Sequence, residues 1–133
     1  MNKNMVSGST AMLILRLLDE KDLYGYEMID LLRQRSSNVF ELKAGTLYPL
    51  LHSLEVKNLV TSYESEYNGK IRKYYKLTKN GKRYLDEKKQ EWEIFSKAVA
   101  DVLCIHEPNK TERKGDQHYE KRLLYRIAAF SNP

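Results

Sequence analysis

Apolar residues recur along the first half of the chain with the spacing of helices, and short polar segments separate them. Residues 11–18 are apolar nearly all round apart from Arg16, and Thr10 is a plausible N-cap before them. Such a segment predicts a helix buried on more than one side, although its periodicity alone is also compatible with a strand. After a charged turn at residues 19–22, residues 24–35 predict a second helix with one apolar face and with cations in its last turn.

A third helical segment has two contrasting faces. Leucines follow the i, i+3, i+4, i+7 spacing of one face: Leu47, Leu50, Leu51 and Leu54. The opposite face carries hydroxyls, an imidazole and an ammonium, which suit contacts with phosphates and base edges: Thr46, Tyr48, His52, Ser53 and Lys57. Pro49 is compatible with a helix that starts near Thr46, but it would distort one that starts near Lys43. Residues 39–42, just before this segment, could form a short strand.

Two segments rich in β-forming residues then predict a hairpin. Residues 59–65 are rich in Val, Thr and Tyr, and residues 71–77 contain Ile and two tyrosines. Between them, Asn68-Gly69 is the strongest short hairpin signal in the chain, because a type I′ turn needs positive φ at both central positions. Basic side chains line the tip and the second strand: Lys70, Arg72, Lys73 and Lys76.

The net charge of +5 is concentrated in this hairpin and in the residues that follow it. Residues 1–57 and residues 85–133 each carry equal numbers of acidic and basic side chains. Residues 58–84 carry seven Lys or Arg and two Asp or Glu. A basic patch of this kind suits the neutralisation of nucleic-acid phosphates, and the alternative is a solvated edge that serves solubility.

Thr78 is a good N-cap for a last, long helix. Positions at alternating spacings of three and four form a heptad seam that is apolar at five of its six places: Leu85, Lys88, Trp92, Phe95, Val99 and Val102. A second copy of the chain, packed around a two-fold axis, is an economical way to bury such a seam. The alternative is packing on its own domain, but three heptads extend beyond so small a body.

Together these elements predict a mainly α protein with a small β-hairpin, organised as a winged helix-turn-helix plus a long C-terminal dimerisation helix. We assign residues 1–77 to the DNA-binding domain and residues 78–104 to the dimerisation helix. Residues 105–133 form a charged tail that could include a short amphipathic helix.

Composition argues against several other classes of protein. The single cysteine, Cys104, excludes an intrachain disulfide framework and fits a reducing cytoplasm. Its spacing to His106 and His118 matches no zinc signature, and no phosphate-binding glycine loop is evident. The longest apolar run, residues 11–15, is far shorter than the ~20 residues that cross a bilayer. We therefore expect a cytoplasmic protein without metal, cofactor, enzymatic activity or membrane contact.

Four blocks of sequence occur in an order and spacing that carry a specific resemblance. They are Leu23-Tyr24-Gly25-Tyr26-Glu27, Gly45-Thr46-Leu47-Tyr48-Pro49-Leu50-Leu51, Ser53-Leu54-Glu55 and Arg72-Lys73-Tyr74-Tyr75-Lys76-Leu77-Thr78-Lys79-Asn80-Gly81. The chain resembles the PadR family of transcriptional regulators from about residue 9 to residue 103. The resemblance implies a dimeric winged-helix repressor that binds inverted-repeat operators in double-stranded DNA and that a small aromatic or phenolic effector releases.

Carried over by position, the resemblance makes residues 43–57 the recognition helix and residues 59–77 the wing. It places Thr46 and Tyr48 on the DNA backbone and the basic residues of the wing on phosphates. The full set of residues expected at DNA is Tyr26, Lys43, Thr46, Tyr48, His52, Ser53, Lys70, Arg72 and Lys73.

Trp92 lies in the middle of the predicted seam, where two copies would face each other. The resemblance implies a ligand role, because a matching tryptophan stacks on flat drugs in some small members of the family. The other interpretation is a core aromatic. Met12, Arg16 and Phe95 could line the same space. A second class of function also stays open, namely an aromatic small-molecule sensor or helical interaction module with only minor DNA contact.

Overall fold

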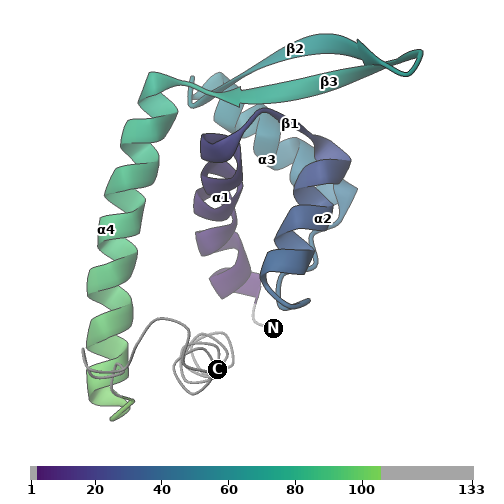
Figure 1. The fold of residues 1–133 in the computed structure, drawn as a ribbon. Coiled ribbons are helices and arrows are strands. Elements are labelled where there is room, and N and C mark those ends of the chain that lie inside the picture. Colours follow the sequence, from purple (N-terminus) through teal and green to yellow (C-terminus); the bar gives the residue numbers. More distant parts are fainter. Residues whose placement is uncertain (1–2, 106–133) are drawn as a thin grey trace. The chain divides into compact units, whose positions relative to one another are not determined.

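The computed structural model describes residues 3–105, and the predicted charged tail after residue 105 lies outside the described residues. Within that range the chain forms four helices and a small antiparallel sheet of three strands (Figure 1). The elements are α1 (Lys3–Glu20), β1 (Leu23–Tyr24), α2 (Gly25–Arg35), α3 (Ala44–Val56), β2 (Val60–Tyr67), β3 (Lys70–Leu77) and α4 (Lys79–Val102). This arrangement confirms the predicted fold class, a winged helix with a long last helix.

The chain divides into two compact units. The winged unit comprises residues 7–89 and contains the sheet, α2, α3, most of α1 and the first part of α4. Of the described residues, the second unit comprises 3–6 and 90–105 and contains the remainder of α4. The boundary between these two units falls inside α4. Among the described residues, no helix combines the length and the apolar character needed to traverse a bilayer.

The core of the winged unit is built around α1. Ile14, Leu15, Leu17 and Leu18 are all buried while Arg16 is exposed, as the nearly all-round apolar pattern predicts. The predicted helix start was wrong, however, because α1 begins at Lys3 and Thr10 is an interior residue that is 5% exposed. Serine and glycine before Thr10 each lower helix propensity by no more than about 1 kcal/mol, which is too little to stop a helix.

Two local predictions around α3 came out differently. Residues 39–42 form no strand, and Leu42 contributes a buried side chain to the core from a loop. Helix α3 begins at Ala44 with Lys43 as its N-cap residue, so Pro49 lies inside the helix and its ring nitrogen leaves the carbonyl of Gly45 without the usual i+4 donor. The helix nevertheless continues to Val56, with Leu47, Leu51 and Leu54 buried.

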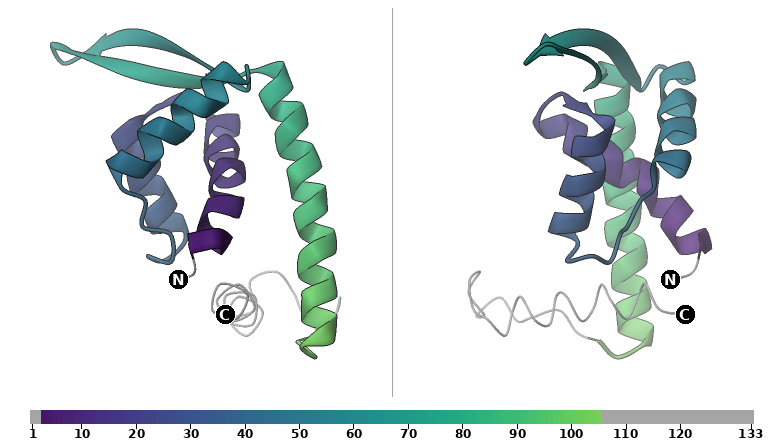
Figure 2. Two further views of the ribbon diagram at one scale, coloured as in Figure 1. Left: turned by 180° about the vertical axis from the view of Figure 1, so that it is seen from behind. Right: turned by 90° about the vertical axis from the view of Figure 1, so that its right-hand side faces the viewer.

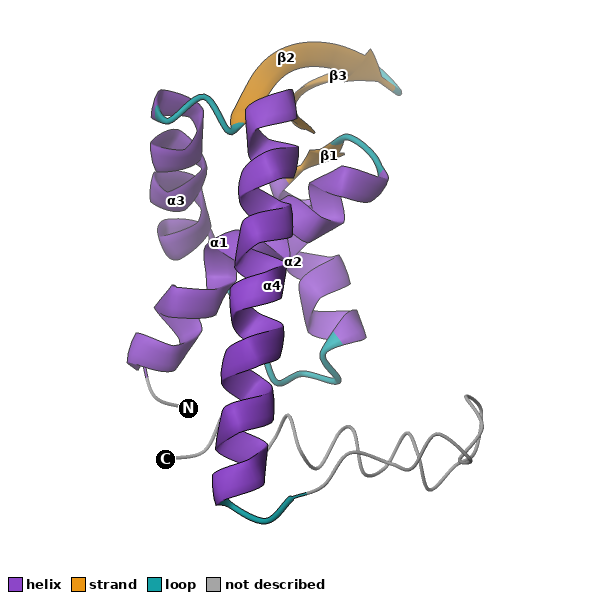
Figure 3. Ribbon diagram, turned by 90° about the vertical axis from the view of Figure 1, so that its left-hand side faces the viewer, coloured by secondary structure: helices purple, strands orange, loops and turns teal. Residues whose placement is uncertain are grey.

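The sheet has the strand order β1-β3-β2 and lies across one end of α1–α3 (Figures 1 and 2). The predicted hairpin is confirmed: Asn68 and Gly69 have φ of 51° and 76°, as a type I′ turn requires. Strand β1 was not predicted because it has only two residues, Leu23 and Tyr24, which pair with Tyr75 and Tyr74 of β3. Colouring by secondary structure shows that strand is confined to this sheet within the described chain (Figure 3).

The junction between β3 and α4 confirms Thr78 as an N-cap. Its hydroxyl oxygen accepts a hydrogen bond from the Gly81 N–H at 2.9 Å, and the hydroxyl donates to the carbonyl of Asn58 at 2.8 Å. A Cβ atom on Gly81 would lie 2.0 Å from the carbonyl oxygen of Leu59, so this close approach requires glycine. Lys82 then pairs with Asp19 of α1 at 2.9 Å. These contacts fix the beginning of α4 within the winged unit.

Candidate nucleic-acid interface

Helix α3 buries Leu47, Leu51 and Leu54, half-buries Leu50 and presents a polar surface to solvent, as its two-faced pattern predicts. Thr46 and His52 are exposed, Tyr48 is 44% exposed, and Ser53 is half-buried. Lys43 is exposed at the N-terminal end of the helix. The side chains available on this surface are hydroxyls, an imidazole and an ammonium, which can donate to phosphates and read base edges.

Tyr48 also has a packing role that the sequence did not reveal. A Cβ atom on Gly25 would lie 2.6 Å from the Tyr48 hydroxyl oxygen, so the phenol sits directly against the first residue of α2. Partial burial raises the pKa of Tyr48, and its neighbours Tyr26 and Tyr75 raise it further. The phenol is therefore a neutral hydrogen-bonding group at physiological pH, and it joins α3 to α2 and to the sheet.

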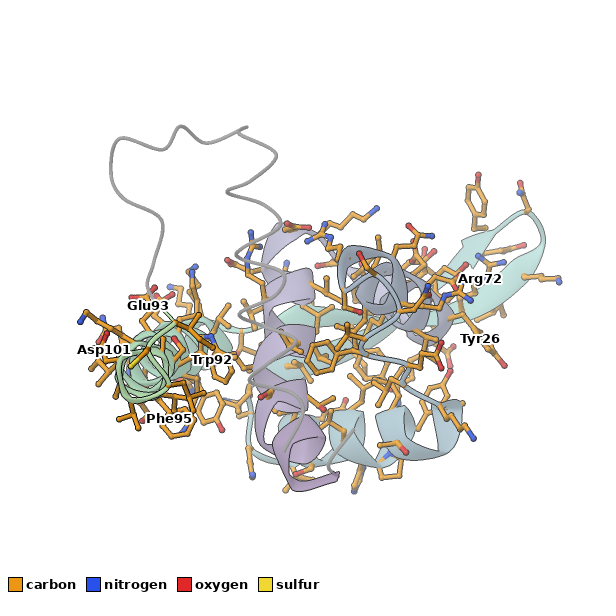
Figure 4. All side chains as sticks on the ribbon, turned by 90° about the horizontal axis from the view of Figure 1, so that it is seen from below. Tyr26, Arg72, Trp92, Glu93, Phe95 and Asp101 are labelled. Carbon is orange, nitrogen blue, oxygen red and sulfur yellow. The ribbon has the colours of Figure 1, made fainter. Side chains whose placement is uncertain are left out.

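Tyr26 lies in the first turn of α2 and is 65% exposed. The backbone N–H of Tyr24, the N-cap residue, donates to the carboxylate of Glu27 at 3.2 Å, which anchors the start of the helix. The guanidinium of Arg72 lies 4.4 Å above the ring of Tyr24. The wing and the N-terminus of α2 therefore meet at this point, where Figure 4 labels Tyr26 and Arg72 near each other.

The three basic wing residues expected at phosphates occupy two different sides of the hairpin. Directly opposed residues of antiparallel strands share a face, and successive residues alternate. Lys70 and Arg72 share one face, whereas Lys73 lies on the other, with its ammonium 5.5 Å from the centre of the Tyr75 ring. Because Tyr75 is buried in the core, Lys73 belongs to the face that continues into the body of the winged unit.

A cluster of tyrosines on the open side of the sheet was missed by sequence reasoning. Tyr24 and Tyr74 make an edge-to-face contact at 5.6 Å, and Tyr74 stacks on Tyr63 at 5.7 Å. The hydroxyl of Tyr63 donates to Asp22 at 2.6 Å. The alternation within residues 59–77 predicts that Tyr63 and Tyr74 can face each other. The third ring could not be placed, because β1 is too short to leave a periodic pattern.

The residues predicted to line an effector site belong to different units. Met12 is half-buried in the winged unit, and Arg16 is exposed there with its guanidinium 3.2 Å from Glu20. Trp92 and Phe95 project from the part of α4 in the second unit, with ring centroids 6.5 Å apart (Figure 4). Trp92 is half-buried and Phe95 is 54% exposed.

The predicted dimer seam needs one correction. Leu85 is 0% exposed and belongs to the core cluster of the winged unit, so it follows the alternative of packing on its own domain. Farther along α4, Val99 is half-buried and Val102 is 82% exposed. Lys88, the polar seam position, lies 5.3 Å from the ring of Tyr84. The apolar seam that remains accessible therefore begins after Leu85.

Metal-ligating groups do not gather in the described part of the chain, where no cluster of three His, Cys, Asp or Glu side chains occurs. Cys104 is an exposed free thiol. His106 and His118, whose spacing to Cys104 matches no zinc signature, lie outside the described residues.

A helix with a polar outer face, packed on a second helix and followed by a basic hairpin, defines the winged helix-turn-helix class of DNA-binding folds. The chain belongs to the PadR family, because residues 14–87 match the profile described as "Transcriptional regulator PadR-like family". It is therefore a transcriptional regulator of that family.

Individual relatives agree with this assignment. The chain is 40% identical over 90 residues to "Uncharacterized protein X" of Lysinibacillus sphaericus, a match that covers 67% of this chain and 83% of that protein. It is 29% identical to "Transcriptional regulator YqjI" of Escherichia coli over 74% of this chain, but it spans only 45% of that protein. The crystal structure of a PadR family transcription regulator from Clostridium difficile superposes with a TM-score of 0.66 at 43% identity, covering 71% of this chain and 98% of that one.

Proposed function

We propose that this protein is a sequence-specific regulator that binds double-stranded DNA as a homodimer and represses transcription at an inverted-repeat operator. The observation that carries the proposal is the polar outer surface of α3. This helix lies in the winged unit together with a hairpin that is rich in basic residues. A helix enters the major groove and reads base edges, while the wing's cations neutralise phosphates.

DNA binding is tested by fluorescence anisotropy with a labelled duplex from the protein's own promoter region. We expect the logarithm of affinity to fall linearly with the logarithm of salt concentration, with a slope of about 0.9 for each phosphate contacted. His52→Ala tests readout by α3, because an exposed side chain can be removed without loss of packing. Its matched control is Lys97→Gln, an exposed α4 residue that pairs with Asp101.

Equal affinity for a scrambled duplex would contradict sequence specificity, and binding that does not depend on salt would contradict phosphate contact. Repression is tested with a reporter gene behind the same promoter. Removal of the regulator should raise expression, and a fall in expression would instead identify an activator.

The proposal of a homodimer is supported by large apolar side chains left exposed on the second part of α4. Phe95 and Val102 of the predicted seam are 54% and 82% exposed. Burial of such residues against a partner stabilises association by roughly 25 cal/mol per Å² of apolar surface. Val102→Asp should convert the dimer to monomer in analytical ultracentrifugation. The control Ala98→Asp places the same charge at an exposed position off the seam and should leave the dimer intact.

We also propose that a flat aromatic or phenolic compound releases the protein from DNA by binding at Trp92 and Phe95. The proposal is supported by two aromatic rings that lie next to each other at a tilt of 52°, because aromatic side chains favour contact with planar aromatic ligands. Trp92 is the only tryptophan in the chain, so its fluorescence reports on this position alone. Saturable quenching by planar phenols, together with release of the labelled duplex, is expected. Quenching without release would contradict a role as effector site.

A further inference from the structure

The hairpin β2–β3 has two faces of very different charge. The register pairs define a tyrosine face, whose members are Thr61, Tyr63, Ser65, Tyr67, Lys70, Arg72, Tyr74 and Lys76. They also define an acidic face, whose members are Val60, Ser62, Glu64, Glu66, Ile71, Lys73, Tyr75 and Leu77. The tyrosine face carries three cations and no carboxylate, whereas the acidic face carries two carboxylates and one cation. Only the tyrosine face of the wing therefore carries a net positive charge.

Lys73 is compensated by its surroundings. Glu64 lies directly across from it in the register, and Glu66 follows on the same face. Cross-strand neighbours of opposite charge attract each other, so Lys73 contributes little net positive potential. On the tyrosine face, by contrast, no carboxylate lies opposite any of the three cations in the register. Neither these cations nor Lys73 forms a close ion pair with any residue that the structure describes.

Arg72 is in addition held in place by the tyrosines. Its guanidinium lies 4.4 Å above Tyr24, which packs edge-on against Tyr74. Tyr74 stacks on Tyr63, and the Tyr63 hydroxyl is fixed by its hydrogen bond to Asp22. Asp22 is the carboxylate that contacts this cluster in the described structure. It accepts its hydrogen bond from Tyr63 and not from Arg72. A guanidinium held over an aromatic ring still directs its N–H groups outward in its own plane, where they can donate to a phosphate.

We infer that the wing binds the phosphodiester backbone of duplex DNA with its tyrosine face, that Arg72 is the principal contact, and that Lys73 makes none. The inference rests on the proposed function and specifies which surface of the wing performs it. Both residues carry the same charge and stand next to each other in the sequence, so net charge cannot distinguish them. Their difference arises from the register, which places them on opposite sides of the hairpin.

The test compares three variants that each remove one positive charge, Arg72→Gln, Lys73→Gln and the control Lys97→Gln. Affinity for the promoter duplex is measured by fluorescence anisotropy at several salt concentrations. Arg72→Gln should weaken binding roughly tenfold or more, as expected for loss of a hydrogen bond to a charged group, and should lower the salt slope by about 0.9. Lys73→Gln should match the control in both quantities. Equal losses for Arg72→Gln and Lys73→Gln, or a larger loss for Lys73→Gln, would overturn the inference.

A second set of variants tests the role of Tyr24 as a positioning residue. Tyr24→Phe keeps the ring under Arg72 and should retain the wild-type affinity. Tyr24→Leu removes the ring and should weaken binding only when Arg72 is present, so that Tyr24→Leu has no further effect in the Arg72→Gln background. Additive losses in this cycle would show that Tyr24 does not act through Arg72. Circular dichroism confirms that each variant is folded. If Tyr24→Leu does not fold, Arg72→Lys tests the contact from the other side, because it keeps the positive charge but loses the planar guanidinium; it should weaken binding, and wild-type affinity would contradict the role of Tyr24.

Failure of the inference and failure of the proposed function give different results. If the wild type binds the duplex and His52→Ala weakens it, but Arg72→Gln does not, the α3 contact stands and the assignment of the wing is wrong. If the wild type binds no duplex, the proposed function fails and the inference fails with it. Tighter binding to a single strand of the same sequence, lost in Tyr67→Ala, would overturn duplex phosphate as the partner and identify the tyrosines as a base-stacking surface.

Discussion

Truncation of Leu85 to alanine distinguishes the core of the winged unit from the seam of a dimer. The side chain is 0% exposed and belongs to the core cluster, so its removal leaves a cavity inside the winged unit. Loss of a fully buried leucine costs about 2–5 kcal/mol, the sum of the lost transfer free energy and the cavity left behind. Val102 of the same helix is 82% exposed and offers a matched control, because Val102→Ala removes little buried surface within one protomer.

Urea denaturation and sedimentation equilibrium separate the two effects. Leu85→Ala should lower the free energy of unfolding by about 3 kcal/mol while leaving the dissociation constant of the proposed dimer unchanged. Val102→Ala should leave the stability of the winged unit within about 0.5 kcal/mol of wild type and should weaken self-association. A loss below about 1 kcal/mol for Leu85→Ala, combined with weaker self-association, would refute the assignment of Leu85 to the core.

Three further predictions concern the junctions of the winged unit. Thr78→Ala should destabilise the protein by about 1–2 kcal/mol in urea denaturation, because the cap of α4 is lost, while Thr78→Ser keeps the hydroxyl and should cost much less; equal losses would argue against the cap. Gly81→Ala should cost more than about 2 kcal/mol despite the better helix propensity of alanine, since the new Cβ would overlap the carbonyl of Leu59, and an equally stable variant would refute this. The hydrogen bond from Arg35 lowers the pKa of Glu20 below 4.5, so its stabilising contribution is present above pH 4.5 and lost as pH falls through the lowered pKa. The stability difference between wild type and Arg35→Gln should therefore shrink on acidification, and a difference that does not change with pH would contradict the pairing.

The polar surface of α3 is exposed, as predicted from sequence, because local pattern determines which side of a helix is buried. The spacing of Leu47, Leu51 and Leu54 defines the buried side of α3, and the opposite side is then necessarily the surface. Tyr48, which belongs to this exposed surface of α3, shows the limit of this reasoning. The helical pattern predicts that its ring points away from the buried side of α3. It cannot predict that a glycine of another helix leaves room for that ring to pack.

The sequence by itself determined the order of the four helices and the hairpin, the hairpin turn and the location of the positive charge. Each of these depends on residues that are neighbours along the chain: the heptad spacing of α4, the positive φ that Asn68 and Gly69 accept, and the basic excess of residues 58–84. These properties depend on residues close together in sequence and not on how the elements pack, which is why they could be predicted.

Only the tertiary structure decided which face of each element meets which neighbour. The two-residue strand β1 exists because β3 offers it a partner, and through it Tyr24 comes to lie under Arg72. Leu85 fits a dimer seam by its heptad spacing, yet its side chain is buried in the core of the winged unit. In both cases the deciding contact joins residues that are distant in sequence, and its free energy appears only once packing has placed them together.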